Sequence, residues 1–478
     1  MMRSLYSGVS GLRVHQTKMD VIGNNIANVN TVGYKSSSVN FSDIFYQTTQ
    51  SATGPNATTG AAGQNAMQIG LGANVASITK AISQTGGAQR TDDPFDIMIT
   101  GDSFFVVNSG GTNYFTKAGA FQLDAAGTLC TPSGAKVMGW GIDPKDPNKT
   151  LAGTVSELNI MSPENLYSKP EATTAAYISG NIDSKDPQIA STGSGKNVTV
   201  EFYDNLGQIY KANYKIKQDA TTTDKYTVEL ADITDKDGKS IFVTKDDKGI
   251  YSEAKDLKVI FGGDVKVENL DSATGKFTLG GPTWPTMEFD GATGKFKQIG
   301  TTKDAKALDL TITATPDSFK PVSIDFSSIT MYATSGNSSL ESQKGTLDSK
   351  GTIGAGKQVG NMDGVSIDSS GKIYGKYDNG DSKLLGQIAV ASFANPAGLE
   401  AVGDNMFAQT QNSGEFDGIG HDVSVGGGRF TTGVLEMSNV DLSQEFTDMI
   451  TTQRGFQANS RIITTSDTLL EELINLKR

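Results

Sequence analysis

Few side chains in this sequence combine the type and the spacing that catalysis or metal binding requires. The two histidines, His15 and His421, stand near opposite ends of the chain, and neither has further ligands at a metal-binding spacing. The single cysteine, Cys130, excludes an internal disulfide and a cysteine-rich zinc site. It lies in a short stretch typical of a strand, where a thiol most simply fills a small buried space. We therefore expect no catalytic residues and no metal.

Glycine-rich segments do not supply a nucleotide or phosphate site either. Gly70, Gly72 and the run 426–428 are not followed by Lys-Ser or Lys-Thr, which favours backbone turns over phosphate loops. Segment 235–240, DKDGKS, has some oxygen ligands of a calcium loop but lacks the closing glutamate, so a hairpin turn is the better interpretation. The sequence thus predicts no cofactor, and the protein is not expected to be an enzyme.

Composition excludes several other classes of protein. With 478 residues the chain has room for about three domains. Its net charge of -12 and pI near 4.8 argue against nucleic acid or an anionic membrane as a partner. No stretch approaches the roughly 20 apolar residues of a membrane helix, and the first residues lack the apolar core and cleavage site of a signal peptide. We expect no membrane insertion, and export, if it occurs, by a route that removes nothing.

Apolar residues recur at every seventh position at both ends of the chain, which predicts two helices that pack on other helices. A companion row runs three residues further along each helix; Gly8 and His15 interrupt it in the first helix, and polar residues such as Thr452 and Asn459 occupy it in the second. Two interpretations therefore remain open, an interface between subunits and a two-helix hairpin that closes one core. The candidate interface residues are Leu5, Leu12, Met19, Ile22, Ile26, Leu442, Met449, Phe456, Ile463 and Leu470.

Between the ends the chain reads as turn-rich β structure, apart from residues 44–79, which contain no charge. That segment is either a flexible linker or one that becomes ordered only against neighbouring subunits. The expected fold is α+β and mostly β, with nested antiparallel β domains between terminal helices. The predicted parts are an N-terminal helix (1–30), a linker (31–70), an inner β domain in two pieces (71–148 and 327–432), an inserted outer β domain (149–326) and a C-terminal helix (433–478).

Both ends also resemble the rod and hook family of bacterial flagellar axial proteins. The N-terminal motif is matched by Asn25, Ala27, Asn28, Thr31, Gly33, Tyr34 and Lys35, and the C-terminal motif by residues 438–442, Gln453, Arg454, Ala458, Asn459, Thr464 and Asp467. Within the family, the length of the chain and segments such as VEFYDNLGQ and IDFSSITMYAT are similar to the hook members, since the distal rod members are much shorter. The segment DPFDIMITGDSFFVV is similar to a family strand, although Asp102 and Ser103 depart from its pattern.

This resemblance implies a structural subunit that polymerises into a curved, flexible tube, the universal joint between the rod of the basal body and the filament. It implies that the terminal helices form an inner coiled-coil layer between subunits, with the β domains stacked outside. The implied partners are the protein itself, the distal rod, the hook cap, the hook-filament junction proteins and the flagellar type III export apparatus. The implied location is the extracellular hook of the flagellum, reached without a cleaved signal peptide.

Three alternatives remain open at this point. A distal rod protein of the same family would have similar ends. A secreted β-rich adhesin would explain the outer domain but not the paired heptads, and it would need exposed aromatic residues beyond Trp140 and Trp284. A secreted hydrolase would need a cleft with paired carboxylates or a triad, and turnover of a soluble substrate would identify it.

Overall fold

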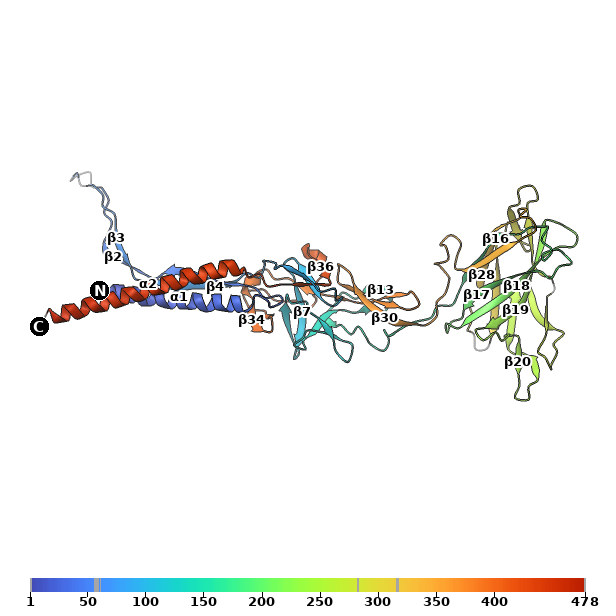
Figure 1. Cartoon of the computed structure of the whole chain (residues 1–478), viewed down its shortest axis with the longest axis horizontal. Helices are drawn as coiled ribbons and strands as arrows, with labels where there is room; N and C mark the ends of the chain where they lie inside the picture. Colours follow the sequence, from blue (N-terminus) through green and yellow to red (C-terminus); the bar gives the residue numbers. More distant parts are fainter. Residues whose placement is uncertain (1, 56–59, 61, 282, 315–317, 477–478) are drawn as a thin grey trace. The chain divides into compact units, whose positions relative to one another are not determined.

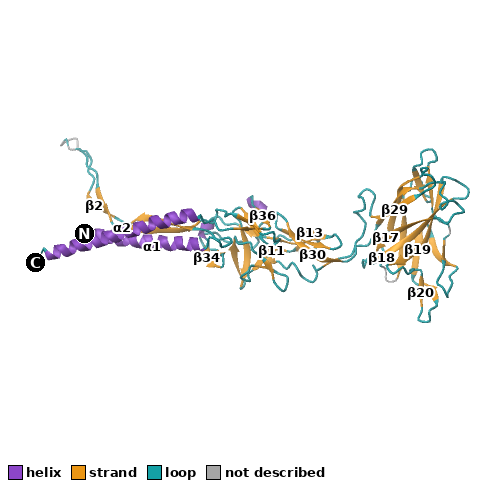
Figure 2. Cartoon of the chain, in the orientation of Figure 1, coloured by secondary structure: helices purple, strands orange, loops and turns teal. Residues whose placement is uncertain are grey.

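The chain divides into two compact units in a computed structural model that describes residues 2–55, 60, 62–281, 283–314 and 318–476. The first unit contains Met1–Asn165, Gly364–Lys376 and Ser382–Arg478, and the second contains Leu166–Asp363 and Tyr377–Asp381 (Figure 1). Both helices longer than one turn belong to the first unit, and within the described residues the second unit is built from strands (Figure 2). The expected mostly-β fold with terminal helices is confirmed.

The two terminal helices lie side by side and antiparallel in the first unit (Figure 1). Helix α1 spans Met2–Ala27 and ends in the asparagine cluster, where the Asn28 side-chain amide donates to the carbonyl of Asn24 at 2.9 Å. Helix α2 spans Leu442–Asn475. It begins later than the predicted residue 433, because the Asp441 side chain caps the first turn by accepting from Ser443 N at 2.8 Å. Within the stretch predicted to be helical, residues 434–436 form strand β37 (Val434–Glu436) instead.

Two strand pairs contain residues of the uncharged segment. Strand β1 (Ser37–Asp43) pairs antiparallel with β4 (Ala73–Lys80), with a bulge at Asn40/Phe41. Between them, β2 (Tyr46–Gln50) pairs with β3 (Met67–Gly70) as a hairpin whose residues are nearly all exposed. Part of the predicted linker, residues 56–59 and 61, lies outside the described residues.

The β part of the first unit is one antiparallel sheet with shorter pairs around it. Its central strands follow the order β32-β11-β7-β8-β35-β34. One face covers a core that includes Phe104, Phe115 and Phe407, and on the other face Phe105 stacks on Phe430 at 5.7 Å between ring centroids. Two pairs join chain segments far apart in sequence, β5 with β37 and β6 with β36. The strands of this unit are β5 (Ala88–Arg90), β6 (Ile97–Thr100), β7 (Phe104–Ser109), β8 (Thr112–Thr116), β9 (Gln122–Leu123), β10 (Leu129–Cys130), β11 (Lys136–Trp140), β12 (Ile142–Asp143), β13 (Asp146–Thr150), β14 (Ser156–Glu157), β32 (Ser382–Ile388), β33 (Val390–Ala391), β34 (Glu400–Gly403), β35 (Met406–Ala408), β36 (Arg429–Thr432) and β37 (Val434–Glu436).

The second unit is a sandwich of two sheets around one core. The sheet β17-β18-β19-β25-β26 is antiparallel, and in the sheet β24-β23-β22-β27-β28-β16-β29 the pair β16 and β28 is parallel. Alternating buried residues of both sheets, such as Ile178, Tyr214 and Phe326, meet in the core. Its strands are β15 (Tyr167–Ser168), β16 (Ala175–Asn181), β17 (Lys196–Tyr203), β18 (Ile209–Gln218), β19 (Lys225–Asp235), β20 (Val243–Lys245), β21 (Tyr251–Glu253), β22 (Leu257–Phe261), β23 (Asp264–Glu268), β24 (Thr278–Gly280), β25 (Thr286–Phe289), β26 (Phe296–Ile299), β27 (Ala307–Ala314), β28 (Val322–Thr330) and β29 (Ser339–Lys344). Strands β30 (Gly360–Ile367) and β31 (Lys372–Tyr377) contain residues of both units.

The observed limits of the inserted unit, 166 and 363, differ from the predicted 149 and 326. At the first limit, β12 pairs with β13 within the first unit, so residues 142–150 do not belong to the inserted unit. At the second, β29 continues the sheet of the second unit by pairing with β16. The predicted limits followed changes in amino-acid composition, whereas the observed limits depend on which strands pair.

Candidate assembly site: the terminal helices and their junction

The face that each terminal helix turns toward the other is small and polar. We call this face the seam. It is marked on α1 by Ser4, Gly8, Gly11, His15, Lys18, Ile22 and Asn25, and on α2 by Glu445, Asp448, Thr452, Gly455, Asn459, Ile463 and Ser466. At its ends the seam is held by a 3.5 Å contact between the hydroxyls of Ser4 and Ser466 and a 2.8 Å hydrogen bond from Asn25 to Glu445. The residues that interrupted the apolar rows in the sequence therefore form the contact within the chain.

Glycines on each helix leave notches that large side chains of the other helix fill. A Cβ on Gly8 would meet Ile463 at 3.2 Å, and one on Gly11 would meet the Asn459 side chain at 2.5 Å. In the opposite direction, a Cβ on Gly455 would lie 2.7 Å from the His15 ring. Since glycine costs about 1 kcal/mol relative to alanine inside a helix, these positions are explained by close approach of the two helices. The notches fix the register of the pair.

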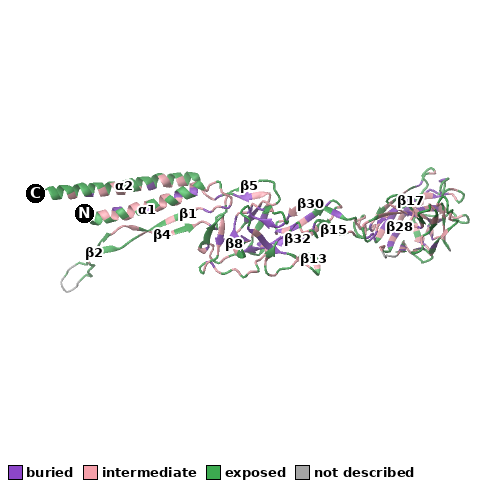
Figure 3. Cartoon of the chain, turned by 90° about the horizontal axis from the view of Figure 1, so that it is seen from below, coloured by how far each residue is buried: buried purple, intermediate pink, exposed green. Residues whose placement is uncertain are grey.

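Because most residues of the seam are small or polar, the large apolar residues of the predicted rows, apart from Ile22 and Ile463, flank it instead of filling it. The pair is antiparallel, so helical periodicity places both rows on the same side of it. We call this side the apolar face, and it consists of Leu5, Leu12, Met19, Ile26, Leu442, Met449 and Phe456, whereas Ile463 lies in the seam and Leu470 continues the seam face of α2. Its residues are half-buried or exposed, and α2 as a whole is exposed along most of its length (Figure 3). Of the ten predicted interface residues, only Ile22 is buried within the chain, at 3% exposure.

His15 lies in the seam with its Nδ1 atom buried and without a hydrogen-bond partner. Its ring packs edge-on against Phe41 of β1, with 6.0 Å between ring centroids. Burial and the neighbouring Lys18 lower the pKa of His15 below its ordinary value. Lys18 is itself 3.6 Å from Asp448 across the seam. The neutral imidazole is thus the form that this packing favours.

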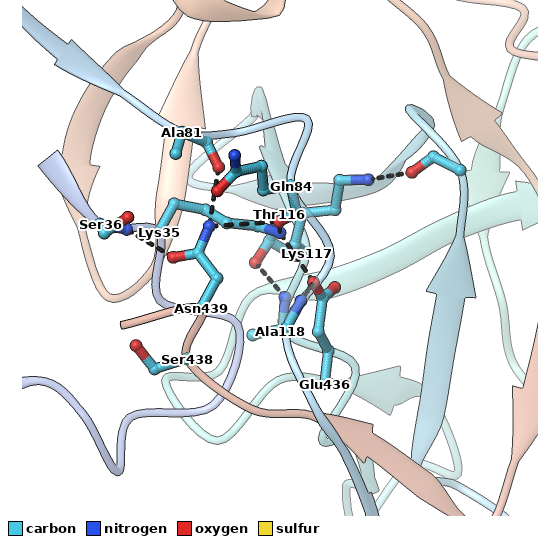
Figure 4. Close-up of polar contacts among 12 residues, drawn as sticks. Lys35, Ser36, Ala81, Gln84, Thr116, Lys117, Ala118, Glu436, Ser438 and Asn439 are labelled. Atoms are coloured by element: carbon cyan, nitrogen blue, oxygen red, sulfur yellow. Dashed lines mark hydrogen bonds and ion pairs between the residues drawn. The ribbon is translucent and has the colours of Figure 1, made fainter. Parts of the chain in front are cut away.

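Where the helix pair meets the β part of the first unit, a buried ion pair joins the segment after α1 to the segment before α2 (Figure 4). Lys35 Nζ donates to Glu436 Oε1 at 2.7 Å and to the carbonyl of Gln84 at 2.6 Å. Gly86 N donates to the same Glu436 oxygen at 2.9 Å, while Glu436 Oε2 is buried with no partner. Both charged side chains are at most 2% exposed. A Cβ on Gly86 would lie 1.9 Å from the carbonyl oxygen of Met437, so only glycine fits there.

Family-motif residues surround this ion pair and connect it to both helices. Asn25 accepts from the hydroxyl of Tyr34 at 3.2 Å and from Ser37 N at 3.0 Å, in addition to its bond to Glu445. Asn439 accepts from Ser36 N at 2.7 Å and donates to the carbonyl of Ala81 at 2.9 Å (Figure 4). We call this group of residues, with Lys35, Glu436, Gln84 and Gly86, the junction. It sets how the helix pair leaves the sheet of the first unit.

A second lysine lies beside the junction. Lys117 Nζ donates to the carbonyl of Gly101 at 2.6 Å and lies over the Phe104 ring, 4.9 Å from its centroid. Burial and the charge of Lys35 lower the pKa of Lys117 to about 8. Keeping the charged amine of Lys117 in this buried position costs free energy, which the hydrogen bond to the carbonyl and the contact with the aromatic ring partly offset.

The remaining motif residues divide between local structure and exposed surface. Thr31 donates to Asn28 at 3.1 Å in the turn after α1, and Gly33 has a φ of 70° and donates to the carbonyl of Glu436 at 2.8 Å. A side chain on Gly33 would meet Ala118 N at 2.7 Å. Ala27 is exposed at the end of α1. On α2 the exposed motif residues are Gln453, Arg454 and Ala458, whereas Asn459 lies in the seam.

The other residues considered for chemistry have structural surroundings. Cys130 is buried in β10, where its thiol contacts the carbonyl of Gln122 at 3.4 Å and burial raises the pKa of the thiol. His421 exchanges backbone hydrogen bonds with Val390. Trp140 is 5% exposed and donates to the carbonyl of Gly153 at 3.0 Å. Among the described residues we find no cluster of three metal ligands and no helix with the length and apolarity to cross a membrane.

Sequence reasoning missed Glu436, Gln84 and Gly86 of the junction, and Lys117 beside it. Gln84 and Gly86 act through backbone groups, which leave no chemical signal in the sequence. Glu436 directly follows an apolar run in its strand, and a single glutamate in such a place is ordinarily a surface residue. The seam did leave a signal, since Gly8 and Gly11 stand three residues apart in one predicted helix and Gly455 stands inside the other.

Three family models match separate parts of the chain. They are described as "Flagella basal body rod protein" (residues 5–35), "Flagellar hook protein FlgE/F/G D1 domain" (98–181) and "Flagellar basal body rod FlgEFG protein C-terminal" (431–476). A curated relative, the flagellar hook protein FlgE of Treponema pallidum, is 34% identical over 487 residues, which covers 100% of both chains. The chain belongs to the flagellar hook protein family.

Other hook proteins match over similar lengths. Flagellar hook protein FlgE of Borreliella burgdorferi is 34% identical and covers 100% of both chains, and that of Salmonella typhimurium is 29% identical over 99% of this chain and 100% of its own. The crystal structure of Helicobacter pylori hook protein FlgE2 covers 73% of this chain at 16% identity, with a TM-score of 0.33 that is too low for a comparison of folds. The resemblance to hook members of the family is confirmed.

Proposed function

We propose that this protein is a structural subunit of the bacterial flagellar hook, which polymerises with copies of itself into a curved, flexible tube between the rod and the filament. The observation that carries the proposal is the composition of the helix pair. Its seam is small and polar, so the large apolar residues face outward, where only other molecules can bury them. Family membership over the full length of hook relatives favours this function over a distal rod protein, which was predicted to be much shorter.

The apolar face supplies the driving force for assembly in this proposal. Phe456 is 36% exposed and Leu442 is 38% exposed in the single chain, although both are large apolar residues. Burying apolar surface yields about 25 cal/mol per Å², so a face of this length contributes several kcal/mol for each neighbour that covers it. The same reasoning makes the predicted interface rows contacts between subunits, with the exception of Ile22 and Ile463, which lie in the seam.

The uncharged hairpin of β2 and β3 is a second contact in this proposal. Phe45 is 76% exposed, Tyr46 55% and Met67 56%, and every residue of the two strands except Gln50 is exposed. An isolated two-stranded hairpin is marginally stable in water. We propose that the hairpin acquires its order from neighbouring subunits, which is the role expected for the uncharged segment.

The further partners and the export route belong to the proposal as well. They are the distal rod, the hook cap, the hook-filament junction proteins and the flagellar type III apparatus, with delivery to the extracellular hook without a cleaved signal peptide. A marginal helix pair suits such a route, because its folding is completed by assembly. A β-rich adhesin is less well supported, since Trp140 is buried and the helix pair would have no purpose.

The decisive experiment compares two glutamate substitutions on α2. Phe456→Glu places a charge on the apolar face, whereas Thr465→Glu places it at an exposed position on the far side of the helix. We expect the first variant to form no tubes in electron micrographs of concentrated protein, and the second to form tubes like the unmodified chain. Circular dichroism of both monomers checks that the helices remain. Tubes of normal length from Phe456→Glu would refute the proposed interface.

A further inference from the structure

Helix α2 continues past the end of its partner. The contact between Ser4 and Ser466 lies close to the first described residue of α1, Met2, whereas α2 continues from Ser466 to Asn475. At 1.5 Å per residue, the last turns of α2 extend about 10 Å beyond α1. We call residues 470–476 the overhang, and Figure 1 shows the C-terminal end of α2 reaching past the N-terminus.

The seam face of α2 changes its chemistry where α1 ends. Opposite α1 this face contains Thr452, Gly455, Asn459 and Ser466. On the overhang the same face continues with Leu470, Leu473 and Ile474. Leu473 is 52% exposed, Ile474 is 66% exposed and the next apolar residue, Leu476, is 84% exposed. The overhang therefore presents a leucine-rich surface that its own α1 does not cover.

A groove of matching chemistry lies between α1 and the neighbouring strands of the same unit. It has a volume of about 600 Å³ and is lined by Tyr6, Val9, Ser10, Arg13, Val14, Thr17, Ile44, Leu71, Ala73, Asn74 and Val75. Tyr6 is 68% exposed, Val9 42% and Ile44 40%, so the apolar walls are open to solvent. Among these described lining residues, Arg13 alone is charged.

We propose that the overhang of one subunit docks in this groove of a second copy of the chain. The inference rests on the proposed function, because it names the contact by which neighbouring helix pairs join. Leucine side chains of the overhang fill the apolar groove, and Glu471, at the edge of the same helix face, complements Arg13. Such a contact runs from the end of one pair to the side of the next, so it repeats in one direction, as a polymer requires.

The occupant cannot be the overhang of the same chain. Leu473 lies seven residues beyond Ser466, and Val9 lies five residues from Ser4 in the opposite direction along the pair. The two side chains are thus about 18 Å apart along the helix axes. A disulfide between cysteines placed at positions 9 and 473 therefore reports a contact between two subunits.

The test uses cysteine pairs in mixed polymers. In a Cys130→Ser background, Val9→Cys and Leu473→Cys are placed in separate proteins of different mass, which are mixed, polymerised and oxidised. We expect mixed dimers after denaturing electrophoresis in the absence of reductant. The matched control replaces Leu473→Cys with Thr447→Cys, an exposed position at the other end of α2, and should give none. Arg13→Glu should raise the critical concentration for polymerisation at least tenfold, and Glu471→Arg in the same protein should restore it.

The outcomes distinguish this inference from the proposed function. If the Cys130→Ser background forms tubes but Val9→Cys and Leu473→Cys give no mixed dimers, the docking is wrong and hook assembly stands. Mixed dimers between Val9→Cys and Gln68→Cys instead would assign the groove to the β2–β3 hairpin of a neighbour and would also overturn the docking. If unmodified protein forms no tubes under any condition, the proposed function itself fails.

Discussion

Removing Lys35 is expected to destabilise the first unit severely, because it would leave the Glu436 carboxylate buried without its cation. The two side chains are 2% and 1% exposed, and after Lys35→Met the carboxylate would retain one hydrogen bond among those found, that from Gly86 N. Breaking a buried pair by removing one partner costs about 3–5 kcal/mol. For a unit of this size that loss corresponds to a fall of about 6–20 °C in the unfolding temperature.

The structure offers controls for this experiment within the same chain. In Lys35→Met/Glu436→Gln no unpaired charge remains, so the double variant should recover a large part of the loss. Arg90→Met breaks a pair whose side chains are 80% and 71% exposed, and it should cost less than about 1 kcal/mol. The second unit contains neither residue, so its unfolding should not change.

The two tryptophans allow each unit to be followed separately. Trp140 belongs to the first unit and Trp284 to the second. With Trp284→Phe the fluorescence of Trp140 reports the first unit, and with Trp140→Phe that of Trp284 reports the second. An unfolding temperature of the first unit that falls by less than 2 °C in Lys35→Met, or a double variant no more stable than the single one, would refute the junction as a stabilising element.

Three further expectations concern the seam and the second unit. Gly455→Ala should destabilise the helix pair by about 1–2 kcal/mol because the added Cβ meets the His15 ring at 2.7 Å. Gly23→Ala, whose Cβ would have nothing within 4 Å, should instead stabilise α1 by up to about 1 kcal/mol. Circular dichroism of the helices during heating measures both changes. The pKa of His15 is lower in the folded chain than in the unfolded chain, so the unfolded chain binds the extra proton first and stability falls as pH drops below about 6.5. Melting temperatures between pH 7.5 and 5 should show this loss of stability, and the loss should be smaller in His15→Gln. An equal loss in that variant would mean that another group causes it. Glu171 and Lys357 exchange backbone hydrogen bonds of 2.9 and 2.8 Å, so they lie side by side and a short Gly/Ser linker can replace residues 172–356 between them. We expect this variant to form tubes of altered curvature in electron micrographs. Either no tubes or unchanged curvature would contradict a separate shaping role for the second unit.

The sequence by itself determined the class of the protein and the presence of its main elements. Apolar residues at every seventh position require helices at both ends, and alternating residues such as those of Val198–Phe202 require strands, because these periods follow from the geometry of a single helix or strand. The long terminal motifs, from Asn25 to Lys35 and from residue 438 to Asn459, also sufficed to identify the family.

Only the tertiary structure decided how these elements are used. The heptad rows could equally have packed on each other within one chain, and it was the close approach at Gly8, Gly11 and Gly455 that placed small and polar residues in the seam and left the apolar face outside. In the same way, Lys35 and Glu436 are hundreds of residues apart, and their pairing depends on β37 lying beside β5. Contacts between distant segments leave no period in a sequence, because they depend on which surfaces meet after the strands have paired.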